Sequence, residues 1–483
     1  MHALLLSACT SSACNFSHLR HCRRAFGSFD QDGSPLLSLE SLAKPALNSQ
    51  HAMPLEYLKQ LRRRFFAWRD ISALIRQLAH HVRGMPEPSE SMALRRLLIL
   101  PSDPWTLVGA KGDEAMMQAV VGRLRQYSSD LQVGVITATP VAHAAAGQLG
   151  FVSVPAWDCS LGEVASQIEA FHPDAMVVLG ADVLDGYYNP VTTSRMLLMA
   201  DAAARHGVRV SILGFSFNNR PNSLVKPVFE GLSKRMAINV RDRVSFDRFR
   251  AFCNAPCRLV ADSAFMLEAD FSGDTVQAVE RWSTSRRAAG DVILGFNMHP
   301  MLFRHASSAQ INALVGSAVS ALRAVAQRRR VSVLLLSHDY RGHDGDDVCL
   351  APIALALADE LGPQLNYPTT QFSAAQLKAM ASFTDGVVTG RMHLAIATLG
   401  MGRPVAALTY QDKFQGLFAH FEYPERFLLT PAAAAQASSL TAMVEEFVDR
   451  LPELTKCVRD HLPAVREASF LNLERVLPSN AVA

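Results

Sequence analysis

Hydrophobic and polar positions follow two different periods along the chain, and the change of period marks its organisation. Over residues 54–83, apolar side chains recur at steps of three and four, which predicts one amphipathic helix whose opposite face is basic. Residues 1–50 show no sustained period and are expected to form a loosely ordered leader. Residues 84–89 are rich in glycine and proline and mark a linker within the segment 51–92. The apolar positions are Leu58, Leu61, Phe65, Trp68, Ile71, Ile75, Leu78 and Val82, and the basic ones are Lys59, Arg62, Arg63, Arg64, Arg69, Arg76 and Arg83.

From Leu94 the sequence pattern changes to short apolar runs separated by helical patterns such as Glu114–Tyr127 and Thr192–His206. Strands that alternate with helices predict a mostly parallel sheet covered on both faces. We assign this first series to a domain spanning residues 93–285. Its predicted strands are Leu97–Leu100, Val133–Thr137, Met176–Leu179, Val208–Leu213 and Met236–Val240.

A second series of strands and helices follows the polar segment Asp270–Gly290, which we interpret as an interdomain connection. It predicts a second α/β domain over residues 286–430, followed by C-terminal helices over 431–483. Two α/β domains in series place a ligand in the cleft that they face. The predicted strands are Val292–Phe296, Val331–Leu336, Gly386–Thr389 and Val405–Leu408, and the helices include Ala309–Arg328 and Ala374–Ala381.

Composition narrows the class of protein further. The chain has 483 residues, 49% of them hydrophobic, which suffices for two domains with appendages. Its 47 basic and 44 acidic residues give a net charge of +3, so no global charge favours a nucleic-acid partner. No apolar run approaches the roughly 18–20 residues of a membrane span. The eight cysteines form no CxxC pair, which is typical of reduced thiols in an intracellular protein.

The strongest chemical signal lies at the junction after the strand Gly386–Thr389. Gly390, Arg391 and His393 follow that strand and open a helix, where free backbone N–H groups and the helix dipole favour an anion. Arginine adds a planar fork for phosphate or carboxylate, and histidine can move a proton near neutral pH. Lys413, just beyond the next strand, is expected to reach the same crevice.

Other polar residues follow predicted strands and are expected at the same edge. The pair Arg241 and Arg243 could bind an anion or form a surface ion pair of little energetic value. The loop from His338 to Asp347 is rich in metal-ligand side chains, but it matches no zinc or EF-hand spacing, so a polar loop lining the cleft is favoured over a metal site. The remaining candidates are Gly180, Asp182, Ser216 and Asp262.

Taken in their order along the chain, the motifs resemble those of the polysaccharide pyruvyl transferase family over about Leu94 to Phe421. The specific part is the ending, Gly390-Arg391-Met392-His393 followed by Tyr410 with Lys413. The weaker matches are Gly112-Asp113-Glu114, Gly180-Ala181-Asp182, Gly214-Phe215-Ser216, Arg241-Asp242 with Ser245, Asp262 within Ala261–Phe265, and Ser337-His338-Asp339.

The resemblance implies two Rossmann-like domains facing a cleft, as in GT-B glycosyltransferases, with the helical extension added at the N-terminus. It implies transfer of a pyruvyl group from phosphoenolpyruvate to a saccharide, with formation of a cyclic ketal and with no metal or further cofactor. The first domain would hold the acceptor and the second the phosphoenolpyruvate. His393, Arg391 and Lys413 would be catalytic, and substrate would be bound by Arg241, Gly390, His338, Asp262, Asp182, Gly180 and Ser216.

Two departures and several alternatives remain. Lys111 stands where the family usually has asparagine, and the first 93 residues have no counterpart in a minimal member.

The same cleft would suit a GT-B glycosyltransferase using a nucleotide sugar, or a non-catalytic glycan- or partner-binding protein. The helix over 54–83 would either lie on an anionic membrane or, as we favour, dock on its own domain. We expect a cytoplasmic protein, with the inner membrane face as a candidate location and a lipid-linked saccharide as a candidate acceptor. The acceptor sugar, its bridged hydroxyls and the oligomeric state stay open.

Overall fold

The computed structural model describes residues 55–83, 85, 88–90, 93–109, 111–409 and 413–478. The predicted leader, residues 1–50, therefore lies outside the described residues. The chain divides into two compact units, Met1–Phe65 and Phe66–Ala483. The predicted N-terminal helix is confirmed as α4 (Leu55–Val82), which crosses the boundary between these units. Within the second unit its residues Ile71, Leu74 and Leu78 are buried, so this half of the helix is docked on its own unit.

The first sheet has seven parallel strands in the order β3-β2-β1-β4-β5-β6-β7. The order runs one way from β1 to β3 and the other way from β4 to β7, which is the doubly wound arrangement of a Rossmann-like domain. The strands are β1 (Arg96–Leu100), β2 (Gln132–Ile136), β3 (Val152–Val154), β4 (Ala175–Val178), β5 (Arg209–Phe215), β6 (Ala237–Val240) and β7 (Arg258–Leu259). The helices are α5 (Lys111–Arg125), α6 (Pro140–Gln148), α7 (Leu161–Phe171), α8 (Pro190–Arg205), α9 (Lys226–Gly231) and α10 (Arg243–Phe252).

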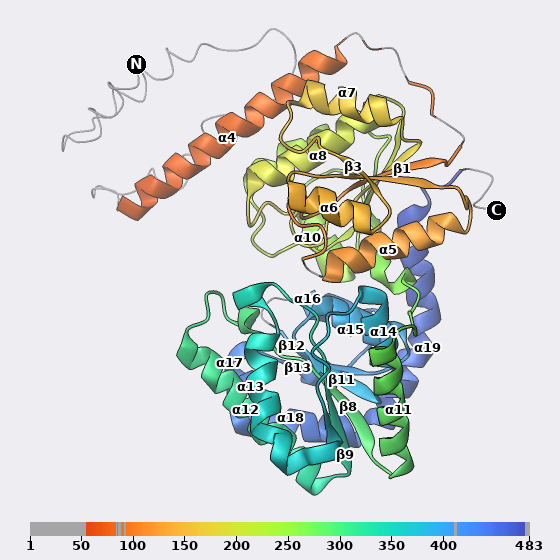
Figure 1. Cartoon of the computed structure of the whole chain (residues 1–483). Coiled ribbons are helices and arrows are strands. Elements are labelled where there is room, and N and C mark those ends of the chain that lie inside the picture. Colours follow the sequence, from red (N-terminus) through yellow and green to blue (C-terminus); the bar gives the residue numbers. More distant parts are fainter. Residues whose placement is uncertain are drawn as a thin grey trace. The chain divides into compact units, whose positions relative to one another are not determined.

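The second sheet repeats the pattern with six parallel strands in the order β10-β9-β8-β11-β12-β13. The predicted α/β class with two Rossmann-like sheets is thus confirmed (Figure 1). The strands are β8 (Val292–Phe296), β9 (Val331–Leu335), β10 (Leu365–Asn366), β11 (Gly386–Thr389), β12 (Val405–Leu408) and β13 (Leu428–Leu429). The helices are α11 (Asp274–Ala288), α12 (Ser308–Arg328), α13 (Asp347–Leu361), α14 (Ala374–Ser382), α15 (Met392–Gly400), α16 (Lys413–Ala419), α17 (Pro431–Ala434), α18 (Ala437–Asp449) and α19 (Leu451–Phe470).

Local sequence signals explain why these elements begin where they do. Ser307 and Gln310 form a capping box at the start of α12, and Ser373 and Gln376 form another at α14. Central strands are apolar on both faces because helices cover both; all seven residues of β5 are buried.

Helix α12 is long and apolar enough by length and composition to cross a membrane, contrary to the expectation that no segment approaches this length. Its apolar face packs on α13 and α18, and Leu314, Leu322 and Val325 are fully buried there. A buried core helix of a globular protein passes the same test of length and composition. One face of α12 therefore belongs to the core, and 39% of its most apolar window is buried.

The segment Asp270–Gly290, interpreted above as a connection, is mostly the helix α11. Val276, Val279 and Ser283 lie at three- and four-residue steps and are buried, and α11 packs on α14 and β8. The buried stripe of α11 consists of only three apolar or small side chains, because the rest of the helix surface is exposed to solvent. The short edge strands β3, β7, β10 and β13 were also not predicted.

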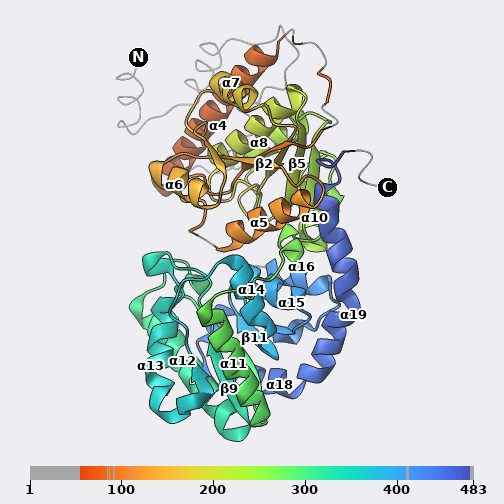
Figure 2. The same cartoon turned by 45° about the vertical axis from the view of Figure 1, so that its right-hand side comes forward.

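Helix α19 runs beside both sheets and ties the C-terminal segment back to the first one (Figures 1 and 2). In the second sheet's half, Arg466 donates to the Gly400 carbonyl over 2.7 Å. In the first, Ser469 Oγ donates to the Asp262 carbonyl over 2.7 Å, and the buried Asn472 accepts from the Gly214 N–H over 2.6 Å. These hydrogen bonds fix the C-terminal segment against the end of α15, against β5 and against the loop that follows β7.

Candidate active site

A cavity of about 380 Å³ lies where loops from both sheets meet, in the second unit. Its walls come from residues after β1, β4, β6, β9, β11 and β12, that is, from the carboxyl ends of parallel strands. The strand order reverses between β1 and β4 and between β8 and β11, and ligands of such sheets bind at these reversals. Most of the predicted site residues are brought together here: Asp182, Arg241, His338, Gly390, Arg391, His393 and Lys413.

Arg391 is held by a closed set of hydrogen bonds on the second sheet's side. Its backbone N–H donates to Thr389 Oγ1 over 2.9 Å, and that hydroxyl donates to Asn297 Oδ1 over 2.9 Å. Asn297 Nδ2 donates to Asp346 Oδ2 over 2.7 Å, and Arg391 Nε donates to Asp346 Oδ1 over 2.8 Å. A further ion pair joins Arg391 Nη1 to Asp339 Oδ2 at 3.1 Å. Arg391 therefore borders the cavity as a fixed cation whose charge is shared with two buried carboxylates.

The loop from His338 to Asp347 contacts the ends of the neighbouring strands. Asp346 accepts from the His338 N–H over 2.7 Å as well as from Arg391, so the loop organises the strand ends. Burial raises the pKa of Asp346, and Arg391 opposes that shift. Within the described residues, no three His, Cys, Asp or Glu side chains are grouped so that they could hold a metal ion.

Three histidines gather beside Gly390. A Cβ added at Gly390 would lie 2.6 Å from His299 Nε2, so glycine is needed for this close approach. Burial lowers the pKa of His299 and of His338 well below the usual range, and the positive charge of Arg391 acts in the same direction on both. These two imidazoles are therefore neutral around pH 7.

His393 lies in the first turn of α15 and packs against the start of α5. A Cβ added at Gly112 would lie 2.2 Å from His393 Nδ1. His393 Nε2 is buried, has no hydrogen-bond partner among the described residues, and lies 3.8 Å from Asp262 Oδ2. Burial lowers the pKa of His393, although Asp262 opposes this, so the ring is neutral and can accept a proton at Nε2 in one tautomer.

Arg241 and Asp262 form a buried ion pair behind His393. Arg241 Nη1 donates to Asp262 Oδ2 over 3.1 Å, and both side chains are about 95% buried. Asp262 Oδ1 also accepts from the Ala264 N–H over 2.9 Å. The alternative of a solvated surface ion pair is therefore wrong for Arg241, although it fits Arg243, which is exposed beside Asp247. Asp262 is positioned to stabilise positive charge on His393.

Lys413, the first residue of α16, forms an ion pair with Asp182, which follows β4. Burial raises the pKa of Asp182, but Lys413 outweighs burial and brings the pKa to about 2. Tyr188 also donates to Asp182 Oδ2 over 3.2 Å. Ala181, just before Asp182, has φ of 41°, which is uncommon for a residue with a Cβ and directs the loop after β4. Tyr410 of the predicted motif lies outside the described residues.

Three predicted substrate-binding residues do not line this cavity: Asp262, which lies behind His393, and Gly180 and Ser216. Gly180 packs behind it, since a Cβ there would lie 2.7 Å from Leu184 and from Phe215. Ser216 Oγ donates to the Ala181 carbonyl over 3.2 Å and borders a second cavity. Neither contact tests a role in binding, so both assignments stay predictions, as do the catalytic roles of His393, Arg391 and Lys413.

Asp113 is a site residue that sequence reasoning noted in a motif but did not select. It lies in the first turn of α5, borders the cavity, and accepts from Ser102 Oγ over 2.6 Å. Burial raises the pKa of Asp113 to about 7, with the Ser102 hydrogen bond opposing the shift. The sequence signal that could have selected Asp113 is its place directly after a glycine at the start of a helix. In the structure this helix start faces the Arg391–His393 motif.

The neighbouring residues Lys111 and Glu114 connect the start of α5 to the start of α14. Lys111 Nζ pairs with Glu114 Oε2 at 2.6 Å, and Glu114 Oε1 accepts from the Ala374 N–H over 2.9 Å at the start of α14. Glu114 therefore caps a helix of the other half of the site.

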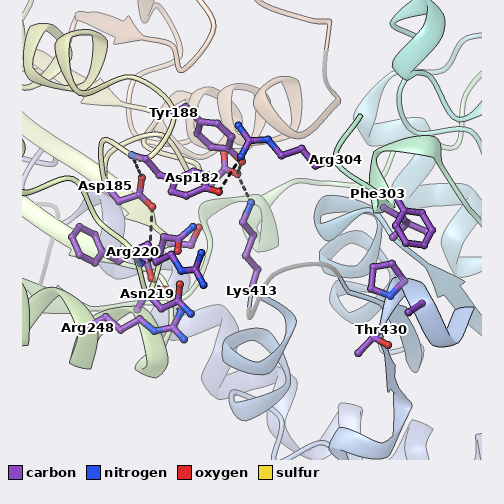
Figure 3. Close-up of a pocket in the computed structure, with 18 residues that line it drawn as sticks. Asp182, Asp185, Tyr188, Asn219, Arg220, Arg248, Phe303, Arg304, Lys413 and Thr430 are labelled. Carbon is purple, nitrogen blue, oxygen red and sulfur yellow. Dashed lines mark hydrogen bonds and ion pairs between the residues drawn. The ribbon is translucent and has the colours of Figure 1, made fainter. Parts of the chain in front are cut away.

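A second cavity of about 510 Å³ adjoins the first and shares Asp182, Tyr188 and Lys413 with it (Figure 3). Its other walls carry Ser216 and the loop after β5, together with residues around Phe303 and Thr430. The Lys413–Asp182 pair thus stands between two cavities of the same site.

Comparison with known families decides the relationship. The family model described as polysaccharide pyruvyl transferase matches residues 111–412, well over half of the chain. The chain belongs to the polysaccharide pyruvyl transferase family. The matched range includes every predicted site residue except Lys413, which lies one residue beyond it. Comparison with curated protein sequences finds no match.

Solved structures give the fold relationship of this pyruvyl transferase family member. A protein assigned as a UDP-N-acetylglucosamine 2-epimerase from Listeria monocytogenes is 11% identical, with a TM-score of 0.53, covering 81% of this chain and 98% of its own. The UDP-GlcNAc 2-epimerase from Neisseria meningitidis, bound to UDP-GlcNAc, is 11% identical with a TM-score of 0.52, covering 79% and 99%. At this identity the likeness shows a shared GT-B-like fold.

Proposed function

We propose that the 380 Å³ cavity transfers a pyruvyl group from phosphoenolpyruvate to a saccharide, forming a cyclic ketal in glycan biosynthesis. The observation that carries the proposal is the arrangement of His393, Asp262 and Arg241 beside Lys413, in a member of this family. Together these groups supply a proton acceptor, a carboxylate to stabilise it, and cations for an anionic donor. The proposal requires no metal and no cofactor besides the donor.

Phosphoenolpyruvate carries a phosphate and a carboxylate, and the cavity offers cations for both. Lys413 and Arg341 border it with Arg391, and each is held by a carboxylate of the protein. The donor phosphate would compete with Asp182 for Lys413, and such charge-assisted hydrogen bonds are stronger than neutral ones. We assign Lys413 to the phosphate, where it stabilises charge as the phosphate leaves.

The reaction balances without any other reactant. A proton adds to the methylene carbon of phosphoenolpyruvate and leaves an oxocarbenium-like centre at C2, which a sugar hydroxyl attacks. The C2–O bond to phosphate then breaks, and a second hydroxyl closes the ring. The two hydroxyl protons end on the new methyl group and on the departing phosphate.

Two residues suit the two proton transfers because their environments differ. Asp113, with a pKa of about 7, retains a proton near neutral pH and suits the acid that protonates the methylene carbon. His393 is neutral, and Asp262 would stabilise the imidazolium formed when the ring accepts a hydroxyl proton. Each such transfer is typically worth about 10²–10⁴-fold in rate.

The decisive test is incubation of the purified protein with phosphoenolpyruvate and a panel of saccharides, followed by mass spectrometry and phosphate assay. We expect release of inorganic phosphate and a product mass increased by a pyruvate ketal. Nucleotide release from a nucleotide sugar, with no phosphate from phosphoenolpyruvate, would instead support a glycosyltransferase. Normal cellular function of a His393→Ala variant would support a non-catalytic binding protein.

We further propose that the protein acts in the cytoplasm, where phosphoenolpyruvate is made, and contacts the inner membrane face through α4. The support is that Phe66, Arg69 and Arg76 are exposed on α4, although its opposite face is docked.

A further inference from the structure

A lysine of α14 is buried in the interior of the second unit. Lys378 is 2% exposed, and its Nζ donates to the Phe265 carbonyl over 3.2 Å and to the Leu267 carbonyl over 2.5 Å. Among the described residues, no carboxylate lies within ion-pair distance of Nζ, and the acidic residue that acts on it electrostatically is the exposed Glu268. Burial of an ammonium group costs free energy, and here two backbone carbonyls offset part of that cost.

The two carbonyls belong to the turn that follows Asp262. Phe265 lies in the short helical turn Ser263–Met266, which Asp262 caps. The Phe265 N–H donates to the Asp262 carbonyl over 3.2 Å, and Asp262 Oδ1 accepts from the Ala264 N–H over 2.9 Å. A displacement of the Phe265 carbonyl would therefore reach the Asp262 carboxylate within one turn of backbone.

Lys378 also lies against the last residue of α15, the helix whose first turn carries His393. A Cβ added at Gly400 would lie 3.2 Å from Lys378 Nζ, and the Gly400 carbonyl accepts from Arg466 over 2.7 Å. Two cations thus stand at the carboxyl end of α15, where the helix dipole favours positive charge. The same lysine contacts both the turn after Asp262 and the helix that positions His393.

We propose that Lys378 is a positioning residue, which holds the turn after Asp262 against α14 and α15 so that Asp262 stays beside His393. This inference rests on the proposed function, because it concerns the pair assigned there to proton transfer. His393 Nε2 and Asp262 Oδ2 are 3.8 Å apart, so a small displacement of the carboxylate changes how strongly it stabilises the imidazolium. Arg241 holds the Asp262 carboxylate and Ser469 its carbonyl, and Lys378 adds a hold on the turn.

The contacts of Lys378 persist on both sides of neutral pH. Burial lowers the pKa of Lys378 to about 7; the charge of Arg466 on α19 acts in the same direction, and Glu268 opposes both. A charged amine carries three N–H groups and a neutral amine carries two, so either form can donate to both carbonyls. The charged form makes the stronger hydrogen bonds.

Lys378→Met tests the role, because methionine fills a similar space but has no N–H group. We expect kcat for phosphate release from phosphoenolpyruvate to fall about tenfold or more, with the KM of phosphoenolpyruvate unchanged, because Asp262 moves while the cations of the cavity keep their partners. Lys378→Gln keeps N–H donors on a shorter side chain and should retain more of kcat. Circular dichroism confirms that both variants are folded.

Val279→Ala is the matched control for a loss of stability. Val279 is buried in the apolar cluster that α11 shares with α14, and it does not contact the two carbonyls. This variant should lower the melting temperature and keep kcat. If kcat fell in Lys378→Met only as far as it falls in Val279→Ala, Lys378 would be a structural residue and the inference would be overturned.

A spectroscopic arm observes the pair without relying on the reaction. Protein with ¹³C-labelled histidine is titrated by NMR, and the His393 signal is the one missing from His393→Gln. Burial lowers the pKa of His393 and Asp262 opposes that shift, so displacement of Asp262 in Lys378→Met should lower this pKa further, by about one pH unit. Val279→Ala should not change it.

An unchanged pKa of His393 in Lys378→Met would overturn the inference even if kcat fell. Absence of phosphate release from the wild type with every acceptor would refute only the proposed function. The titration would still show whether Lys378 sets the position of Asp262 relative to His393.

Discussion

Replacing Gly112 with alanine separates the contribution of His393 from the stability of the fold. The added Cβ would lie 2.2 Å from His393 Nδ1 and 2.7 Å from Cε1, whereas ordinary contacts begin at 3.4 Å. The ring or the start of α5 must therefore move by about 1.2 Å to restore contact. A displacement of about 1 Å in a catalytic site can cost about 10²-fold in rate. We expect kcat/KM to fall by about that factor, measured as phosphate release from phosphoenolpyruvate.

Helix propensity works in the opposite direction and supplies the control. Alanine is favoured over glycine inside a helix by about 1 kcal/mol, so Gly112→Ala is not expected to unfold α5. Gly122 lies on the same helix, and a Cβ added there meets nothing within 4 Å. Gly122→Ala should therefore raise the melting temperature slightly and leave kcat/KM unchanged. If Gly112→Ala kept kcat/KM within about threefold of the wild type, a fixed His393 ring would not be needed for the reaction.

Three further predictions address charge and pH. Asp113→Asn should lower kcat by about 10²–10⁴-fold. The wild type should lose activity as pH rises through 7, and the variant should not show this loss. A wild-type rate that stays constant from pH 6 to 8 would contradict the acid role of Asp113. Because its folded pKa is raised, Asp113 contributes stability that is complete below about pH 4 and lost as pH rises through 7, so the variant should gain more in melting temperature at pH 8 than at pH 5. Lys413→Met should raise the KM for phosphoenolpyruvate by about tenfold. Asp182→Asn removes the carboxylate that competes with the donor for Lys413, so it should not raise this KM. If steady-state kinetics gave equal increases in KM for the two variants, the pair would act as a structural unit instead. Arg69→Gln/Arg76→Gln should weaken binding to anionic vesicles in sedimentation assays by about 1 kcal/mol per residue, and unchanged binding would exclude α4 as the membrane contact.

The interior of the fold was predictable because its signals are local. The strands Val292–Phe296, Gly386–Thr389 and Val405–Leu408 match β8, β11 and β12, since apolar runs between glycine and polar residues mark buried parallel strands. Edge strands such as β7, two residues long, carry no such run and depend on pairing with a neighbour. Helix α11 was missed because most of its surface is polar.

The gathering of strand-end residues was also predictable, since parallel strands place their carboxyl ends on one edge. Their partners were not. Arg391 meets Asp346 across 45 positions, and Lys413 meets Asp182 across 231, so no spacing in the sequence indicates either pair. The raised pKa of Asp113 arises from burial, which only the assembled fold supplies.

The hydrogen bonds made by the end of α19 and the residues just after it have a consequence for how the protein is made. Ser469 reaches the Asp262 carbonyl across 207 positions, and Asn472 reaches the Gly214 N–H across 258. During synthesis the first sheet emerges long before these partners, because the N-terminal part of a chain leaves the ribosome first. The loop that carries Asp262 would therefore acquire its final anchor only near the end of translation. A nascent chain stalled before Ser469 should have both sheets and the Arg241–Asp262 pair, but it should lack this backbone anchor of the loop that carries Asp262.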